Sequence, residues 1–408
     1  MRIALVGAGV VGLSSAYWLR RLGHEVQLLE RATLGSGASR GNAGEICPEL
    51  ATPVAKFSLV RSAVTQAYRR DSALHVNPAA LPSYAGFLSK VVANALPSRY
   101  ADNQAALSDL ATAARQAFEA IADDVGVSLC RGGYLHVYDT LDKAREGRAD
   151  VKARLSAAGV SDTVGPLLSP SELAEVEPCL KPQSYGFLYE RGTFVDPNVF
   201  VDSLWRHLSG HGVTLHEGVT TTHVSRTGRE SVVHTDRGDF AADGVVICAG
   251  IGSSQIARAS GRDVPIRAGK GYSFTIHPLP APRHVVKFEA AHVALLPLGE
   301  GARVAGTMEF DTDPGRFNSR RIHQIVNALR PYLDDAVLDT RTHEWVGARP
   351  VTPDGLPLIG EFPHLPNTYL ACGHNMLGLM LSPVTGQLVA NHIAGGAPLS
   401  RAFSPSRF

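Results

Sequence analysis

Residues 1–30 read MRIALVGAGVVGLSSAYWLRRLGHEVQLLE. The short apolar run at residues 3–6 is typical of a buried parallel strand, and the apolar residues within 13–22 have helical spacing. A glycine-rich turn at 7–12 separates the two, and a second strand at 25–29 ends on the acidic Glu30. This order of strand, glycine turn, helix, strand and acid predicts a βαβ unit of the kind that binds a dinucleotide.

Each glycine of the turn has a mechanical reason. Gly7 permits the tight turn, Gly9 lets the backbone approach a pyrophosphate, and Gly12 lets the helix pack closely on the strand. The start of the helix offers N–H groups and the positive end of its dipole to phosphates. Glu30 stands at about the spacing at which a carboxylate reaches a ribose hydroxyl. Because G-x-G-x-x-G alone is a weak signal, an ordinary βαβ unit with a glycine-rich turn is the alternative.

The composition of the whole chain excludes some classes of partner. With 408 residues the chain exceeds what one hydrophobic core usually supports, so we expect two domains. A formal net charge of +1 gives no field that would select nucleic acid. The five cysteines are scattered without metal-ligand spacing, so we expect no metal site and a reducing, cytoplasmic location. No apolar run reaches the roughly 18 residues of a transmembrane helix.

Two segments after the first βαβ unit have open interpretations. Residues 31–49 (RATLGSGASRGNAGEICPE) are small and glycine-rich, which suits contact with the ligand; a plain surface loop is the alternative. Residues 56–70 (KFSLVRSAVTQAYRR) have apolar and basic faces, which fits a solvated amphipathic helix or one in peripheral contact with the inner membrane face. Helical patterns at 103–127 and 141–159, with a strand at 133–138, predict a domain that covers the substrate.

After residue 194 the sequence again shows the strands and glycine turns that characterise residues 1–30. A strand at 245–248 runs into Ala249 and Gly250, a second strand-to-glycine turn of the type that packs against a dinucleotide. Residues 264–276 and 293–310 have the pattern of long strands in a mixed or antiparallel sheet. We therefore expect a discontinuous cofactor-binding domain. Its segments are 1–52, 195–262 and 340–408, and the substrate-binding domain takes 53–194 and 263–339.

The last third of the chain carries a second strong signal. Residues 345–360 (WVGARPVTPDGLPLIG) are dense in proline and glycine, which predicts a fixed irregular loop around Arg349. A strand at 368–372, the turn GHNMLG at 373–378 and an apolar helix at 379–393 follow. Two strand–turn–helix units, one near each end of the sequence, suit a long ligand held at both ends, with an isoalloxazine carbonyl at the second helix start. A nicotinamide enzyme has no need of this second clamp.

Six motifs resemble FAD-dependent oxidoreductases of the D-amino acid oxidase superfamily, and most closely the bacterial D-amino acid dehydrogenases. They are VGAGVVGLSSAYWLRRLGHEV at 6–26, SRGNAGEICP at 39–48, EVEPCL at 175–180, KGYSFTI at 270–276, WVGARPVTPDGLPLIG at 345–360 and CGHNMLGLMLSPVTGQL at 372–388. The resemblance spans nearly the whole chain in order. It implies an α/β fold: a Rossmann-like FAD-binding domain with an inserted substrate domain, whose mixed or antiparallel β-sheet and helices roof the flavin.

The resemblance also implies which residues hold FAD. Those on the dinucleotide would be Gly7, Gly9, Val10, Val11, Gly12, Glu30, Arg31, Ala249 and Gly250, with Glu30 on the ribose. Those on the flavin would be Ser39, Asn42, Ala43 and Gly44 along its side, and Gly373, Gly378, Leu379 and Met380 at the pyrimidine edge.

Three residues are candidates for the catalytic site. Arg349 falls where related amine-oxidising enzymes place the arginine that pairs with the substrate carboxylate, and a guanidinium binds a carboxylate through two parallel hydrogen bonds. The alternative is that Arg349 only stabilises its own proline-rich loop. Tyr272 is either a second donor to that carboxylate or a core aromatic. His374 touches the substrate or only the flavin.

The mechanism implied by the resemblance is hydride transfer from the substrate α-carbon to flavin N5. A D-amino acid would give an imino acid that hydrolyses to a 2-oxo acid and ammonia, and the electrons would pass to a quinone, a partner subunit or oxygen. Close relatives have Gly-Thr-Leu-Gly-Trp after the Gly-His pair, whereas this chain has Asn-Met-Leu-Gly-Leu at 375–379. Met376 and Leu379 would reshape the pocket wall, so a cyclic imino acid such as D-proline or D-hydroxyproline is an alternative substrate.

Two other functions stay open at this point. Within the same class, the chain could oxidise glycine, sarcosine or an opine with oxygen as acceptor. From a different class, it could be an FAD-binding subunit that relays electrons and needs a partner protein.

Overall fold

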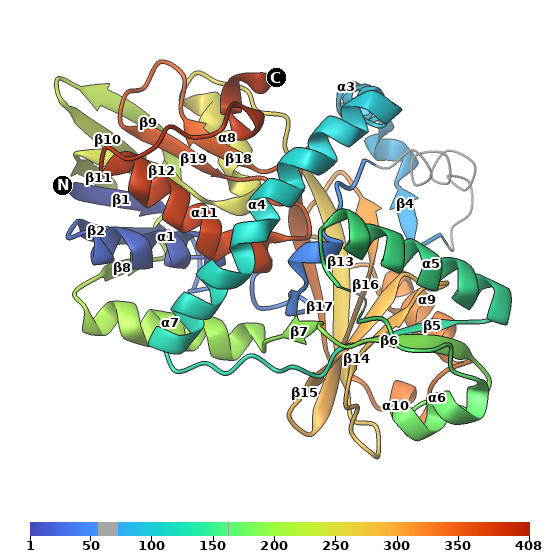
Figure 1. The fold of residues 1–408 in the computed structure, drawn as a ribbon. Coiled ribbons are helices and arrows are strands. Elements are labelled where there is room, and N and C mark those ends of the chain that lie inside the picture. The colour runs from blue at the N-terminus through green and yellow to red at the C-terminus, as the bar shows by residue number, and fades with distance from the viewer. Residues whose placement is uncertain (56–71, 162) are drawn as a thin grey trace.

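The computed structural model describes residues 1–55, 72–161 and 163–408 of the chain. Its strands form a six-stranded sheet, an eight-stranded sheet and two small sheets. The six-stranded sheet lies on the left of Figure 1 and the eight-stranded sheet on the lower right. The amphipathic stretch at 56–70 lies outside the described residues, so its interpretation stays a prediction.

The six-stranded sheet has the order β18–β19–β12–β1–β2–β8 and is parallel except for the β18–β19 pair. Its strands are β1 (Arg2–Val6), β2 (Glu25–Glu30), β8 (Thr214–Glu217), β12 (Gly244–Ile247), β18 (Leu358–Glu361) and β19 (Thr368–Cys372). One face packs on helices α1 (Val10–Arg21), α4 (Pro97–Asp124), α7 (Pro197–Gly210) and α11 (Gly378–Ile393). The other face packs on helix α8 (Ser253–Ala259) and a small sheet of β9 (Thr221–Thr227), β10 (Glu230–Thr235) and β11 (Gly238–Ala242).

Helix α1 begins inside the glycine turn, at Val10 rather than at the predicted residue 13. The absence of a side chain at Gly12 permits this, because a Cβ there would lie 2.0 Å from the carbonyl oxygen of Gly7. The first turn of the helix therefore sits directly on the end of β1. Since β1, β2 and β12 are parallel, their carboxyl ends bring the glycine turn, Glu30 and Ala249 to one edge of the sheet.

The eight-stranded sheet has the order β17–β13–β16–β15–β14–β5–β6, with β4 also paired to β16. Its strands are β4 (Leu74–Val76), β5 (Tyr134–Tyr138), β6 (Tyr185–Tyr189), β13 (Arg267–Ile276), β14 (Val285–Phe288), β15 (Val293–Leu298), β16 (Gly301–Phe310) and β17 (Thr342–Val351). One face packs on α6 (Pro170–Val176), α9 (Ser319–Leu329) and α10 (Asp335–Asp339). The remaining elements are α3 (Leu81–Asn94), α5 (Leu141–Ala157), the pair β3 (Glu45–Ile46) and β7 (Thr193–Phe194), and short 3₁₀ turns at Pro48–Leu50, Pro78–Ala80, Gly250–Gly252, Arg401–Phe403 and Pro405–Arg407.

The prediction of an irregular loop over 345–360 was wrong for its first half. Residues 345–351 belong to strand β17, which pairs with β13 so that Arg349 stands opposite Gly269. Pro350 lacks an N–H, but β17 is the edge strand of its sheet, where a proline with its nitrogen on the open side breaks no ladder hydrogen bond. Arg349 is therefore held by a strand and not by a loop.

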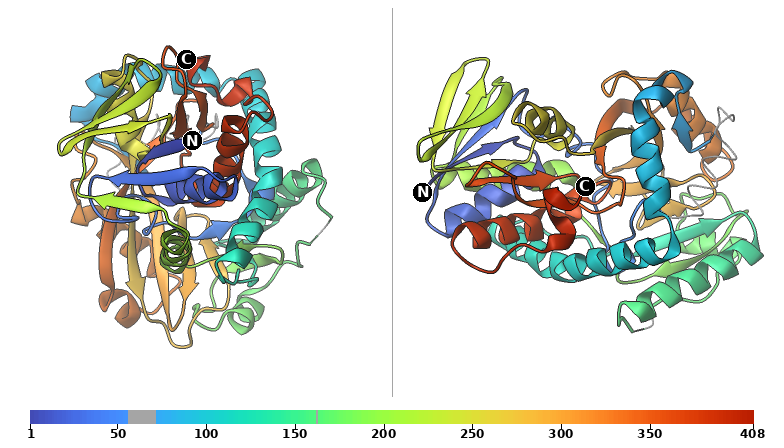
Figure 2. Two further views of the ribbon diagram at one scale, coloured as in Figure 1. Left: turned by 90° about the vertical axis from the view of Figure 1, so that its left-hand side faces the viewer. Right: turned by 90° about the horizontal axis from the view of Figure 1, so that it is seen from above.

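Two elements cross the expected domain boundaries. Strand β17 pairs with the eight-stranded sheet, although residues 340–408 were expected with the cofactor domain. Helix α4 shares the core of the six-stranded sheet, although it was expected in the substrate domain. Figure 2 shows α4 running from the helices of that sheet toward the other half of the molecule. The two-domain division stays a prediction. Strand β17 and helix α4 each pack on the sheet of the other expected domain.

Candidate cofactor and substrate site

A cavity of about 1690 Å³ is lined by both large sheets. The lining includes Gly7, Gly9, Val10 and Val11 from the first glycine turn. Helix α1 begins at Val10, with Gly9 as its N-cap, and its first turn contains no acidic residue that would neutralise the positive end of the helix dipole. These features form a cradle that an anion such as a pyrophosphate fits.

Glu30 and Ser39 fix the shape of this cradle. One carboxylate oxygen of Glu30 accepts the N–H of Ala8 at 2.9 Å and the other accepts that of Ala32 at 3.1 Å. The hydroxyl oxygen of Ser39 accepts the N–H of Val10 at 3.1 Å. Both side chains line the cavity and hold the turn in place.

Most of the predicted cofactor residues meet at this cavity. The lining also includes Arg31, Asn42, Ala43, Ala249, Gly250, Gly378, Leu379 and Met380. Gly12, Gly44 and Gly373 are not among the lining residues. They pack against protein: a Cβ would meet the carbonyl oxygen of Gly7, the carbonyl oxygen of Val195 and the side chain of Thr352, respectively.

The second clamp lies at the start of helix α11, far along the sequence from the first. The helix begins at Gly378 without a side-chain cap or an acidic residue in its first turn, and its first three residues line the cavity. His374, in the preceding turn, is buried and shares a hydrogen bond of 2.9 Å between its Nε2 and the hydroxyl of Thr385. Burial lowers the pKa of His374 to about 4, so the ring is neutral at pH 7.

Arg349 reaches the cavity from strand β17. Its guanidinium lies over Gly271 on the next strand, where a Cβ would be only 2.3 Å from the guanidinium carbon. Nη1 donates to the carbonyl oxygen of Thr307 at 2.7 Å. Burial lowers the pKa of Arg349 to about 10, so it is still a cation at pH 7. Among the described residues no acid forms an ion pair with it, which leaves a cation at the cavity wall able to receive an anion.

Tyr272 lies on the opposite side of its strand from Arg349. Successive side chains of a strand point to opposite faces, and Tyr272 follows the glycine over which Arg349 lies. The tyrosine is buried in the core cluster that packs on α9, and its hydroxyl donates to Glu309 at 2.5 Å. Tyr272 is also among the residues that line the cavity, but its hydroxyl is engaged by Glu309 on the far face. We therefore prefer the core aromatic over the donor to the substrate, and this choice stays a prediction.

The sequence analysis missed an ion pair in the cavity wall. The Nζ atom of Lys287 lies 2.7 and 2.5 Å from the two carboxylate oxygens of Glu45, and both residues line the cavity. Burial acts to lower the pKa of Lys287, but the carboxylate of Glu45 outweighs it and raises that pKa. Glu45 lies within residues 31–49, the segment expected to contact the ligand, and this was the one signal available in the sequence.

Trp345 forms another part of the wall that was not predicted. A Cβ at Gly41 would lie 2.3 Å from the indole ring and one at Gly347 would lie 1.8 Å from it. The ring therefore fits against two positions without side chains, one in the loop after β2 and one on β17. Met376 and Leu379, the positions that depart from the relatives' pattern, also line the cavity.

Two helix starts without an acidic first turn line one cavity, together with Glu30 at ribose spacing and the cation Arg349. This combination is typical of an oxidoreductase that binds a dinucleotide. The chain belongs to the FAD dependent oxidoreductase family, whose model matches residues 2–392. It is 31% identical to the D-amino acid dehydrogenase of Chromohalobacter salexigens, covering 98% of this chain and 97% of the relative. It is also 31% identical to that of Azorhizobium caulinodans, with the same coverage.

Solved structures agree on the fold. Glycine oxidase from Geobacillus kaustophilus superposes with a TM-score of 0.77 at 22% identity, covering 100% of this chain and 99% of that one. The L-proline dehydrogenase from P. horikoshii gives a TM-score of 0.73 at 18% identity, covering 100% and 97%. The expected α/β fold with a Rossmann-like half and a mixed sheet is thus confirmed, and the protein is FAD-dependent.

Two features are absent from the described residues. In residues 1–55, 72–161 and 163–408, no helix has the length and apolar character needed to cross a bilayer. The same part of the chain contains no cluster of His, Cys, Asp or Glu able to hold a metal ion.

Proposed function

We propose that this chain catalyses the FAD-dependent dehydrogenation of a D-amino acid to the imino acid, which water converts to a 2-oxo acid and ammonia. The relatives that share about 30% of its residues over nearly its whole length are named D-amino acid dehydrogenase, which supports the substrate class. The observation that carries the proposal is Arg349, a cation in the cavity wall whose guanidinium pairs with no acid of the described chain.

Arg349 would bind the substrate carboxylate. One of its nitrogens is fixed by the carbonyl of Thr307, which sets the plane of the guanidinium. The remaining N–H groups suit a carboxylate held by two parallel hydrogen bonds, and this geometry fixes the orientation of the α-carbon. Bound FAD supplies the acceptor for the hydride, and the protein supplies position and charge.

The residues that would hold FAD follow from the two clamps. The first glycine turn and Glu30 would bind the pyrophosphate and ribose, and the start of α11 would face the pyrimidine edge of the flavin. His374, neutral and bonded to Thr385, would support the flavin and not exchange protons with the substrate. We assign no catalytic base, because a substrate amine that is already neutral assists the loss of hydride with its own lone pair.

The electron acceptor is a second part of the proposal. The relatives are named dehydrogenases and not oxidases, which supports a quinone or another carrier in place of oxygen. Peroxide formation in air, compared with reduction of a quinone analogue, separates the two acceptors directly.

The test is anaerobic reduction of the bound flavin by a panel of amino acids. D-alanine, D-phenylalanine, D-arginine, their L-enantiomers, glycine, sarcosine and both enantiomers of proline are each mixed with the purified yellow protein. Loss of flavin absorbance with D-amino acids but not with L-amino acids is expected. A response only to proline would move the substrate to the cyclic imino acids. Failure of every amine would contradict the proposal and favour a partner-dependent subunit.

A further inference from the structure

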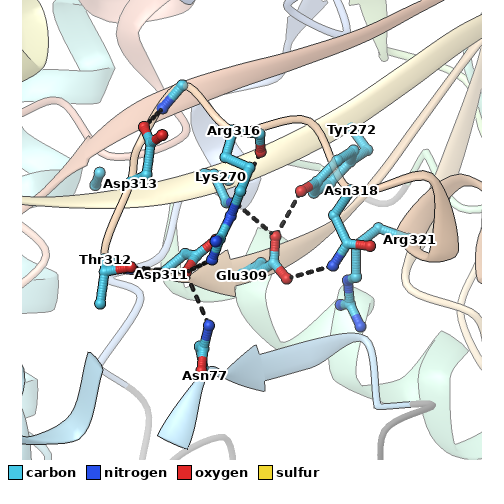
Figure 3. A network of polar contacts seen from close by, with 12 residues as sticks. Asn77, Lys270, Tyr272, Glu309, Asp311, Thr312, Asp313, Arg316, Asn318 and Arg321 are labelled. Atoms are coloured by element: carbon cyan, nitrogen blue, oxygen red, sulfur yellow. Dashed lines mark hydrogen bonds and ion pairs between the residues drawn. The ribbon is translucent and has the colours of Figure 1, made fainter. Parts of the chain in front are cut away.

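A buried cluster of charges lies behind the substrate pocket, on the opposite face of the sheet from Arg349. The ammonium of Lys270 is fully buried and lies 2.9 Å from Glu309 and 2.7 Å from Asp311. It also donates to the carbonyl oxygen of Arg316 at 3.0 Å, so all three of its N–H donors are used. Figure 3 shows Lys270 between the two carboxylates.

The two carboxylates are satisfied by further donors. Glu309 accepts from the hydroxyl of Tyr272 at 2.5 Å and from the amide of Asn318 at 3.0 Å. Asp311 accepts from Arg316 at 2.6 Å, from Asn77 at 2.9 Å and from the N–H of Thr312 at 2.8 Å. Burial acts to raise the pKa of both acids, but these hydrogen bonds outweigh it and lower both pKa values. The two carboxylates therefore stay ionised at neutral pH, next to the ammonium of Lys270.

Glu309 of the cluster contacts the residues on both sides of a β-bulge between strands β13 and β16. Strand β13 pairs Lys270 with Glu309 and Tyr272 with Gly306, so Gly271 alone stands opposite Thr307 and Met308. This is a β-bulge with one extra residue on β16. Lys270 and Tyr272, the two neighbours of Gly271, both bond to Glu309 and so hold the bulge from behind.

Thr307, inside the bulge, adopts a conformation that must be imposed by its surroundings. Its φ is +60°, which is unfavourable for a β-branched residue. Its buried hydroxyl has no hydrogen-bond partner among the described residues, so no side-chain contact of that kind explains the conformation. Such strain persists only where neighbouring structure over-determines it, and its effect here is to aim the carbonyl of Thr307 at Nη1 of Arg349.

We propose that the Lys270–Glu309–Asp311 cluster is a positioning device for Arg349: it locks the bulge so that the carbonyl of Thr307 fixes the guanidinium in the plane that receives a carboxylate. None of the three residues lines the cavity, so they would act through Arg349. The inference rests on the proposed function only in that the carboxylate is taken to be that of the substrate.

The first experiment weakens the cluster and measures carboxylate binding to the flavin-loaded protein. Glu309→Gln keeps the shape and removes the charge, and Tyr272→Phe removes one hydrogen bond and keeps the charges. Benzoate, a carboxylate that cannot be dehydrogenated at an α-carbon, is titrated while flavin absorbance is followed. We expect benzoate to bind about tenfold more weakly to Glu309→Gln and about threefold more weakly to Tyr272→Phe, with flavin content unchanged.

Tyr332→Phe is the matched control. Tyr332 belongs to the same core cluster and donates its hydroxyl to Asp139, but it has no part in the bulge. It should alter stability as Tyr272→Phe does and leave benzoate affinity at the wild-type value. Equal affinity for benzoate in all of these variants would overturn the proposal. Because Tyr272→Phe is milder than Glu309→Gln, it keeps the test available if the glutamine variant does not fold.

A double-mutant cycle then asks whether the effect passes through Arg349. In an Arg349→Met background, adding Tyr272→Phe or Glu309→Gln should produce no further loss of benzoate affinity, since the group being positioned is gone. Losses that add in full would show that the cluster acts elsewhere and would overturn the inference. Benzoate binding needs no turnover, so a protein that oxidises no amino acid yet passes this cycle contradicts the proposed function and not the positioning role.

Discussion

Arg349 and Gly271 stand on neighbouring strands, and the guanidinium of Arg349 fills the space in which a side chain at residue 271 would begin. A Cβ added to Gly271 would lie 2.3 Å from the guanidinium carbon and equally close to Nη2. The guanidinium of Arg349 therefore packs directly on the backbone of Gly271. A side chain at residue 271 would push the guanidinium away from this position.

Gly271→Ala should displace Arg349 without disturbing the flavin clamps. The new methyl group requires the guanidinium to move, whereas the glycine turn and the start of α11 are formed by other segments. We expect KM for the amino acid substrate to rise by about tenfold or more, with flavin content within error of wild type. Steady-state kinetics and the flavin-to-protein absorbance ratio give the two readouts. An unchanged KM would show that the arginine does not contact the substrate.

Arg349→Lys and Arg349→Met separate charge from geometry. Lysine keeps a positive charge but cannot form the planar pair of hydrogen bonds, so we expect KM to rise by about tenfold. Methionine removes the charge as well, and we expect a loss in kcat/KM of about a hundredfold or more. Anaerobic flavin reduction at several substrate concentrations distinguishes weaker binding from slower hydride transfer. If both variants matched wild type, the carboxylate would have to bind elsewhere in the cavity.

The sequence was sufficient for the parts of the site that depend on local pattern. The glycine turn, Glu30 and the start of the last helix follow one another at fixed short spacings, and the structure brings them to one cavity. The start of α1 was misplaced by three residues because the packing of Gly12 on Gly7 is a contact across a turn, which periodicity does not report.

Features that depend on pairing between distant strands could not be predicted in this way. A proline-rich stretch argues against a strand unless the strand lies at an edge, and the edge position of β17 is known only from the sheet order. The side on which Tyr272 points depends on a bulge opposite Gly271, which one strand's sequence does not reveal. The Glu45–Lys287 pair likewise joins residues 242 positions apart.

The Glu45–Lys287 pair should couple in stability measurements. Removing either partner leaves the other charge partly buried and unpaired, so Lys287→Met and Glu45→Gln should each lower the free energy of unfolding by about 1–3 kcal/mol. The double variant should lose less than the sum of the two. Urea unfolding of the flavin-loaded proteins at pH 7 measures all three. Simple additivity would mean that the close contact contributes no coupling energy.

His374 should make the stability of the holoprotein depend on pH in acid. Burial lowers its folded-state pKa to about 4, whereas an unfolded histidine has a pKa of about 6.5, so between these values the unfolded chain binds a proton that the folded chain does not. This residue's contribution is therefore fully present above about pH 6.5 and is lost as pH falls, at up to about 1.4 kcal/mol per pH unit. His374→Gln cannot titrate there and keeps a polar group near Thr385, so its unfolding free energy should fall less between pH 7 and pH 5 than that of wild type. Parallel curves for the two proteins would show that the ring protonates without unfolding, and hence that it is open to water in the cavity.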